Sequence, residues 1–237
     1  MTVLSRILTK PLIVAAAVAM PLTACGQSSD TGESLAAKAK METMVDVPET
    51  TITSGTYAND PTHTSMAVSL IHLGFAPYAV QFADVDATLD LDLENPADST
   101  VSFDLAADSV FTSYRGDYKA THKNSKHDTW EEAVAKDFLG AETQPTITFR
   151  STRFDYEGGM TGTVYGNLAM NGITKPAQFD IEITGEGLHP FNQKEGVGIV
   201  AKGTVTRADY DIAQSMNNFL SDEVTINFSA DFLKAAE

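Results

Sequence analysis

The sequence feature that most constrains the fold is a series of segments in which apolar and polar residues alternate. In VDATLDLDL, from Val85 to Leu93, every odd position is apolar and every even position is polar. Side chains of a β-strand point alternately to the two faces of a sheet. The pattern therefore predicts a strand with one face in a core and the other in water.

The same alternation recurs along most of the chain. It is found in an opening segment from Tyr57 to Phe75 and in TVSFDLA, TITF, TVYGNLAM, AQFDIEI, VGIVAKGTV and DEVTINFSA. The pair Asn171-Gly172, between two of these segments, is the strongest short-range signal of a hairpin turn. About eight strands are expected, enough to close a small barrel that holds either side chains or one ligand. The predicted fold is therefore all-β, an antiparallel eight-stranded barrel.

The alternation stops in residues 117–139, where a helical pattern replaces it. Trp130, Val134 and Phe138 follow at helical spacing, and Gly140 provides a stop signal. We expect a helical insertion that covers one end of the barrel. Amphipathic spacing already accounts for Trp130, so we interpret it as a packing anchor and not as a ligand contact.

The N-terminal region has the features of an export signal. Arg6 and Lys10 precede an apolar run, residues 11–22, that ends in small residues and Cys25. The run is shorter than the roughly 20 residues of a membrane-spanning helix, so residues 1–24 are predicted to be a signal peptide. Leu-Thr-Ala-Cys resembles a lipobox, which predicts lipidation of Cys25 and a periplasm-facing anchor, at the outer membrane rather than the inner. An ordinary signal peptide is the alternative.

Residues 25–55 are rich in Ser, Thr, Glu and Ala and contain no aromatic residue. This composition predicts a flexible tether. The remainder, residues 56–233, has the size of one domain and carries all of the strand pattern.

The charge balance is strongly acidic. The chain has 16 Lys and Arg against 32 Asp and Glu, a net charge of −16. An acidic surface repels phosphate, which argues against nucleic-acid binding and against electrostatic docking on anionic lipid. Cys25 is the only cysteine, so the domain has no internal disulfide and depends on its core for stability.

The common catalytic motifs are absent from the sequence. It contains no G-x-S-x-G, S-x-x-K, P-loop, G-x-G-x-x-G or H-E-x-x-H, so we expect no enzymatic activity and no cofactor. His122 and His127, with Asp117 and Asp128, are the best metal candidates. Five residues apart, the two histidines face different directions on a helix or a strand, and we expect a solvated polar segment instead.

Two further histidines lie in the opening strand. His63 follows Asp60-Pro61 and is expected to close a turn with Asp60. His72 shares the apolar face of the strand that begins at Met66. It is therefore either a core histidine with a satisfied hydrogen bond or the polar contact of a binding cavity.

Several separate motifs together resemble one known family. They are DPTHTSMAVSLIHLGF, DSVFT, QPTITFRST, GNLAMNGITKPAQFDI and TRADYDI, in that order. From Tyr57 to about Phe232 the chain resembles the YceI family, exported lipocalin-like barrels that bind polyisoprenoid lipids. It departs from the family pattern at Asp211, where glycine is usual, and in the segment THKNSKHDTWEEAVAK, which looks longer or more divergent.

The resemblance implies a lipocalin-like barrel that binds, stores or transports a polyisoprenoid, such as a prenyl quinone or prenyl phosphate, without catalysis. A long hydrocarbon gains about 0.8 kcal/mol per buried methylene, so an apolar lumen can hold it without charge. His72 is predicted to donate a hydrogen bond to the polar head. Strand parity and the motif match together predict the lipid contacts, which are His72, Phe75, Phe82, Phe103, Leu105, Phe149, Leu168, Phe179 and Ile181.

Two alternatives stay open at this point. One is an envelope interaction protein with a barrel filled by side chains, whose acidic surface docks a basic partner. The other is a metal-dependent hydrolase that uses the histidines of the insertion. Strand parity cannot separate a filled core from an open lumen, and the sequence does not decide whether the protein forms a homodimer.

Overall fold

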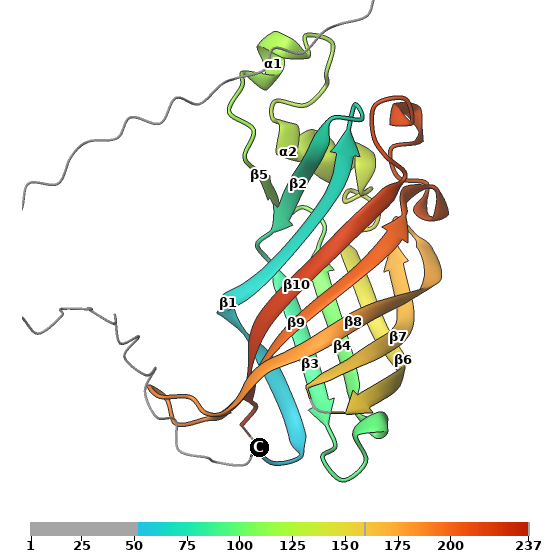
Figure 1. The fold of residues 1–237 in the computed structure, drawn as a ribbon. Coiled ribbons are helices and arrows are strands. Elements are labelled where there is room, and N and C mark those ends of the chain that lie inside the picture. Colours follow the sequence, from blue (N-terminus) through green and yellow to red (C-terminus); the bar gives the residue numbers. More distant parts are fainter. Residues whose placement is uncertain (1–51, 159, 237) are drawn as a thin grey trace, which may run out of the picture. The chain divides into compact units, whose positions relative to one another are not determined.

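The alternating segments form ten strands within residues 52–158 and 160–236, which a computed structural model describes (Figure 1). Eight of them close into an antiparallel barrel in the order β1, β10, β9, β8, β7, β6, β4, β3, with β3 pairing again with β1. The predicted all-β barrel is confirmed. The strands are β1 Gly55–His72, β2 Ala76–Phe82, β3 Val85–Leu91, β4 Thr100–Ala106, β5 Val110–Thr112, β6 Thr146–Gly158, β7 Thr161–Met170, β8 Ile173–Leu188, β9 Glu195–Thr206 and β10 Glu223–Lys234.

Strand β1 belongs to two parts of the sheet. Its first residues, 55–58, pair with β3, whereas residues 66–72 pair with β2, which in turn pairs with β5. The change of partner coincides with a register shift between Asn59 and Thr64. The Asn59 side chain bridges the gap, because its Nδ2 donates to the Val85 carbonyl at 2.9 Å and its Oδ1 accepts from the Ala87 N–H at 2.7 Å.

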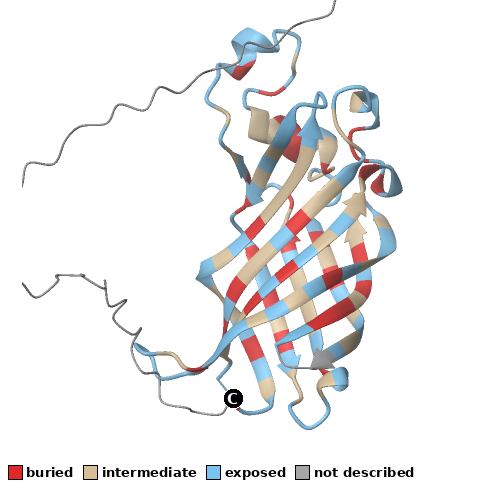
Figure 2. Ribbon diagram, in the orientation of Figure 1, coloured by how far each residue is buried: buried red, intermediate tan, exposed pale blue. Residues whose placement is uncertain are grey.

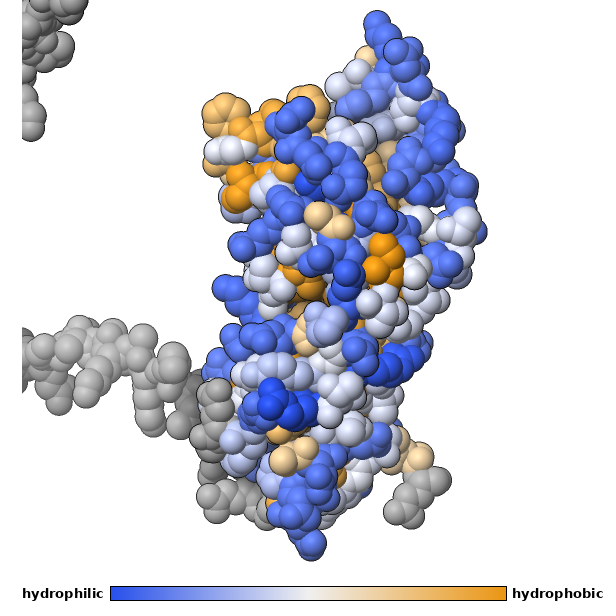
Figure 3. Space-filling model, turned by 90° about the vertical axis from the view of Figure 1, so that its right-hand side faces the viewer, coloured by the Kyte–Doolittle hydropathy of each residue, from blue (hydrophilic) through white to orange (hydrophobic). Residues whose placement is uncertain are grey.

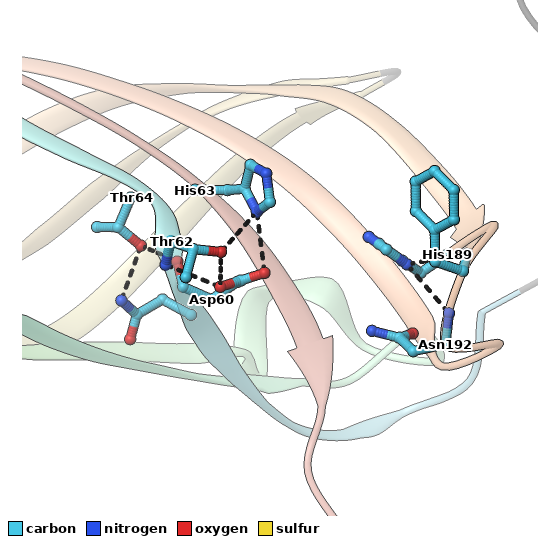
Figure 4. Close-up of polar contacts among 8 residues, drawn as sticks. Asp60, Thr62, His63, Thr64, His189 and Asn192 are labelled. Atoms are coloured by element: carbon cyan, nitrogen blue, oxygen red, sulfur yellow. Dashed lines mark hydrogen bonds and ion pairs between the residues drawn. The ribbon is translucent and has the colours of Figure 1, made fainter.

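The bulge itself is held by a cluster of polar contacts (Figure 4). Asp60 accepts hydrogen bonds from the backbone N–H and the hydroxyl of Thr62, and its Oδ2 lies 3.0 Å from His63 Nδ1. The predicted contact of His63 with Asp60 is therefore confirmed. His63 lies within β1 and not ahead of it, because the strand continues on both sides of the bulge.

The insertion forms two short helices, α1 Tyr118–Thr121 and α2 Trp130–Ala133, and α2 continues into a single π turn, η2 Val134–Phe138. The insertion therefore contains two short helices and not one long helix, and the helical spacing of Trp130, Val134 and Phe138 falls on α2 and the π turn. Asp117 caps α1 by accepting from the Ala120 N–H, and Thr129 caps α2 by accepting from the Glu132 N–H. Gly140, with φ 66°, follows the π turn as the predicted stop. Three short 3₁₀ turns complete the elements, η1 Pro96–Asp98, η3 Arg207–Tyr210 and η4 Gln214–Met216.

Buried residues alternate with exposed ones along the barrel strands (Figure 2), as the sequence pattern predicts. The Asn171-Gly172 turn also forms as predicted, with positive φ at both residues and Met170 paired with Ile173. No helix in the described part of the chain is long and apolar enough to cross a membrane. The predicted signal peptide, Cys25 and most of the predicted tether lie outside the described residues.

Candidate functional site

The barrel interior contains two cavities. The larger, about 320 Å³, lies toward the end where β3 turns into β4, and the smaller, about 130 Å³, lies under α2 and the π turn. Three buried or half-buried side chains, Met66, Phe103 and Ile226, line both cavities, so the two spaces are neighbours along the barrel. The interior is therefore not filled by side chains over its whole length.

Seven of the nine residues predicted to contact a ligand lie in the cavity walls. Phe82, Leu105 and Leu168 line the smaller cavity, and Phe149, Phe179 and Ile181 line the larger. Phe103 lines both and stacks on Phe149, with ring centroids 5.7 Å apart. Strand parity placed these side chains on the correct face because the strands run without interruption at these positions.

His72 and Phe75 lie elsewhere, and the expectation that they line the lumen is wrong. His72 is the last residue of β1 and is exposed, and Phe75, in the β1–β2 turn, is 88% exposed. Neither borders a cavity, although Met66, Val68 and Leu70 on the same face of β1 do. Parity gives the direction in which a side chain points, but it does not show where the barrel wall ends.

Two aromatic side chains that the sequence reasoning did not assign to the site lie in the wall of the smaller cavity, and each has a buried polar atom. Tyr78 on β2 and Trp130 at the start of α2 both line this cavity. Their rings meet edge to face, 6.4 Å between centroids. The Tyr78 hydroxyl and Trp130 Nε1 are buried, and no hydrogen-bond partner for them exists among the described residues. The helical spacing of Trp130, Val134 and Phe138 did place all three on one face, and that face borders the cavity.

Arg207 contributes a buried positive charge to the wall of the same cavity. Its side chain is 2% exposed, and no carboxylate pairs with it among the described residues. All five guanidinium N–H groups are nevertheless engaged. Nε donates to the Ser221 carbonyl (2.8 Å), Nη1 to the carbonyls of Ile212 (2.7 Å) and Ala213 (3.1 Å), and Nη2 to Asn217 Oδ1 (3.1 Å) and the Leu220 carbonyl (3.2 Å). Arg207 thus fixes the segment that joins β9 to β10 and has no donor left for a ligand.

The opposite end of the barrel carries a polar cluster, which we name the latch, formed by Thr53, Tyr57, Glu195 and Lys234. The Tyr57 hydroxyl has a single hydrogen, and two acceptors lie within its reach, the Thr53 carbonyl at 2.6 Å and Glu195 Oε2 at 2.8 Å. Lys234 Nζ lies 3.1 Å from Glu195. The backbone N–H of Thr53 is the main cause that lowers the pKa of Glu195 to about 2, while burial, followed by the Glu195 charge, raises the pKa of Tyr57. The latch holds Ile52 in the wall of the larger cavity.

The candidate metal residues have separate structural partners. His127 Nε2 lies 3.0 Å from Asp137, Asp128 pairs with Lys119 at 3.1 Å, and the His122 ring stacks on Tyr118. Within residues 52–158 and 160–236, no three His, Cys, Asp or Glu side chains are placed to hold one metal ion. The insertion therefore uses these residues to fold its loop.

Comparisons with known proteins agree with the fold. A UPF0312 protein of Pectobacterium atrosepticum is 26% identical over 197 residues, which cover 83% of this chain and 87% of that protein. The crystal structure of Burkholderia cenocepacia BcnA superposes with a TM-score of 0.59 at 16% identity, over 75% of this chain and 99% of that chain. A structure described as a polyisoprenoid binding domain from Saccharophagus degradans, implicated in plant cell wall breakdown, gives a TM-score of 0.52 at 9% identity, over 77% and 99% of the two chains.

The family assignment follows from the domain as a whole. The match begins at residue 57, close to the start of β1, and ends at residue 232, close to the end of β10, so that it contains nearly all of the barrel and both cavities. This confirms the resemblance seen in the motifs. Since residues 57–232 match the YceI-like domain, the chain belongs to the YceI family.

Proposed function

We propose that the barrel binds the apolar chain of a polyisoprenoid lipid in its interior, as a non-enzymatic carrier or store. The observation that supports this most strongly is the pair of neighbouring cavities, about 320 and 130 Å³, with mostly apolar walls. The larger cavity is at the lower limit of the volumes of ligand pockets, about 300–1,000 Å³, and the smaller cavity adjoins it. Each methylene that enters such a space contributes about 0.8 kcal/mol, so a long prenyl chain needs no charged contact along its length.

The comparison with the Saccharophagus degradans domain, described as polyisoprenoid binding, supports the same class of ligand. A barrel filled by side chains is the alternative. It is disfavoured because Met66, Phe103 and Ile226 border open space on both sides.

The unpartnered donors of Tyr78 and Trp130 indicate which polar head group the lipid carries. A buried donor without a partner costs about 1–3 kcal/mol, and indole N–H can only donate, so the matching ligand group is an oxygen acceptor. The nearby charge of Arg207 has all of its N–H groups engaged. A charged phosphate would lose its water of hydration on entering this site, and two neutral donors would not compensate for that cost. A neutral quinone carbonyl loses less hydration, and two donors are enough to satisfy it. We therefore favour a prenyl quinone over a prenyl phosphate, with the head beside Tyr78 and Trp130.

The cellular location is part of the proposal. The sequence of residues 1–24 and the lipobox-like segment before Cys25 support export and lipidation of Cys25, with the barrel facing the periplasm. Transport or storage would then take place between membrane and periplasm.

Native mass spectrometry of the protein, produced in a bacterium with its own signal and purified gently, tests the ligand class. We expect a co-purified mass that organic extraction identifies as a prenyl lipid. A clean protein mass that takes up neither added prenyl quinone nor prenyl phosphate would refute the proposal and favour the filled-barrel interaction protein.

The head-group position has its own test. Tyr78→Phe and Trp130→Phe should each weaken binding of a prenyl quinone roughly two- to tenfold, the value of one hydrogen bond, and leave binding of a plain polyprene hydrocarbon unchanged. Tyr114→Phe, at a tyrosine outside both cavity walls, is the control. Equal losses for both ligands would mean that the two residues only shape the cavity.

A further inference from the structure

The end of the barrel next to α2 carries an exposed apolar cluster, which we name the apolar tip: Ile71, Leu73, Phe75 and Phe219. The first three lie in and beside the β1–β2 turn, and Phe219 lies in the loop before β10. Phe75 is 88% exposed and the others 39–47%. Figure 3 shows a group of hydrophobic residues at this end of the barrel, on a surface that is otherwise mostly hydrophilic.

Hydrogen bonds join the two loops into one surface. The Leu73 N–H donates to the Phe219 carbonyl at 2.6 Å, and the Ser221 N–H donates to the Ile71 carbonyl at 2.8 Å. The Ile71 N–H donates in return to the Ser221 hydroxyl at 2.8 Å. The apolar tip is therefore a fixed surface and not a chance meeting of two free loops.

The backbone of the tip is unusual for a turn that only has to fold. Leu73 and Gly74, in a three-residue turn, have φ of 53° and 72°, close to the φ of 51° and 76° of the two-residue turn Asn171-Gly172. Asn tolerates this left-handed conformation, whereas a Leu side chain is disfavoured in it. A large apolar side chain thus stands where hairpin formation favours a small polar one, which points to a role for the side chain itself.

Charges are distributed around the tip in a pattern that differs from the rest of the chain. Residues 64–83 and 212–221 contain no Asp, Glu, Lys or Arg, although the chain as a whole has 32 acidic residues. The segment 115–126, which contains α1 at the same end (Figure 1), holds four of the 16 basic residues, all exposed, against the single acidic Asp117. Lys119 pairs with Asp128 at 3.1 Å and Lys126 with Asp137 at 2.9 Å, whereas Arg115 and Lys123 form no ion pair with any described residue.

The tip also adjoins the smaller cavity. Leu70 and Leu220, the direct neighbours of Ile71 and Phe219 in the chain, line this cavity, and an isolated bridge pairs His72 with Leu220. The apolar surface and the apolar interior are therefore one residue apart on both loops.

We infer that the apolar tip docks on an anionic phospholipid bilayer, with the basic segment 115–126 against the head groups, and that lipid enters and leaves the smaller cavity at this end. The entry of lipid rests on the proposed function, whereas docking does not. Because the acidic surface as a whole argues against electrostatic docking on anionic lipid, the apolar side chains of the tip supply the main contribution. The unpaired charges of Arg115 and Lys123 favour this end over the acidic remainder of the surface.

A fluorescent label that reports a change from water to lipid tests this in the full chain. Cys25→Ser removes the native cysteine, and Phe75→Cys then places the label on the tip. The matched control is Phe191→Cys, at a Phe that is 92% exposed in the β8–β9 turn at the other end of the barrel (Figure 1). With vesicles of phosphatidylethanolamine and phosphatidylglycerol, we expect a blue shift at position 75 and none at position 191.

Residues 1–51 are the same in the Phe75→Cys and Phe191→Cys variants. Vesicle binding through these residues alone would therefore give no difference in shift between the two labelled positions. No shift at position 75, or equal shifts at both positions, would overturn the inference. If native mass spectrometry finds prenyl lipid while position 75 stays in water, docking fails and the proposed function stands. If position 75 enters the bilayer but no lipid is ever bound, docking stands and the proposed function fails.

Side-chain variants separate the apolar and the charged contributions. Leu73→Asn, which suits the turn, and Phe75→Ser should each weaken vesicle binding about tenfold, the effect of one apolar side chain, whereas Phe191→Ser should leave it unchanged. Arg115→Glu and Lys123→Glu should each weaken binding to phosphatidylglycerol vesicles about fivefold or more and have no effect with phosphatidylcholine alone. Undiminished binding by Leu73→Asn and Phe75→Ser would contradict the assignment.

Discussion

Leu73 and Asn171 occupy the same left-handed conformation in two hairpins of one barrel, with φ of 53° and 51°. Asn171 also uses its side chain, whose Nδ2 donates to the Tyr210 carbonyl at 3.0 Å. Leu73 makes no such compensating bond, and its side chain is 47% exposed. The first turn therefore has a conformational cost that the second does not.

Leu73→Asn should stabilise the fold by about 1 kcal/mol, because it relieves the left-handed strain at a side chain that is 47% exposed. Urea denaturation, followed by tryptophan fluorescence, measures this. The reverse change, Asn171→Leu, should destabilise by more than that, since it adds the strain and also loses the bond to Tyr210. A loss of stability in Leu73→Asn would show that the leucine packs in a way that offsets its backbone strain.

Among the structural elements, β1 depends most on a single side chain. The strand leaves β3 and joins β2 across an irregular stretch, and Asn59 supplies there the donor and acceptor that a regular backbone would have offered to Val85 and Ala87. Val85 and Ala87 are both buried, so no water can replace the amide easily. Single side chains also set the bounds of elements in the insertion, where the caps Asp117 and Thr129 determine where the two short helices begin.

Asn59→Ala should destabilise the barrel by about 1–3 kcal/mol, since it leaves the Val85 carbonyl and the Ala87 N–H unpaired in a buried place. Chemical denaturation gives the free energy, and hydrogen exchange at Ala87 should become faster than at residues further along β3. Asn227→Ala, at an exposed asparagine of β10, is the matched control and should stay within about 0.5 kcal/mol of the wild type. Equal effects of the two changes would mean that the bulge needs no side-chain bridge.

Across the whole barrel, the two ends differ in chemistry. One end carries the latch of Thr53, Tyr57, Glu195 and Lys234, and the other carries α2, the apolar tip and the smaller cavity, whose wall includes Tyr78 and Trp130. An ionised Glu195 is needed to accept the hydrogen bonds of the latch. One end of the barrel is thus held by a charged cluster, whereas the other presents an apolar surface.

This arrangement predicts an acid-sensitive latch. The pKa of Glu195 is lowered from 4.5 to about 2 in the folded state, so its stabilising effect is complete above pH 4.5 and is lost as the pH falls toward 2. Thermal unfolding of the wild type and of Glu195→Gln, measured across that interval, should converge at the acidic end. Other carboxylates titrate equally in both proteins, and only the difference reports the latch. Parallel curves would show that Glu195 makes no pH-dependent contribution.

The sequence by itself determined the closed antiparallel barrel, the Asn171-Gly172 turn and seven cavity-lining residues, because strand alternation and turn chemistry are local properties. It did not place His72 or Phe75, since both lie at a strand end where parity continues but the barrel wall does not. It also missed Tyr78 and Arg207 as wall residues, and it predicted one helix in the insertion where the structure has two short ones.

Only the tertiary structure decided these features. The latch joins residues more than a hundred positions apart, the apolar tip combines two distant loops, and a donor becomes unpartnered only once packing has removed water from around it. A linear pattern records which way each side chain points. The meeting of distant segments, which opens a cavity or exposes an apolar surface, depends on the closure of the whole barrel.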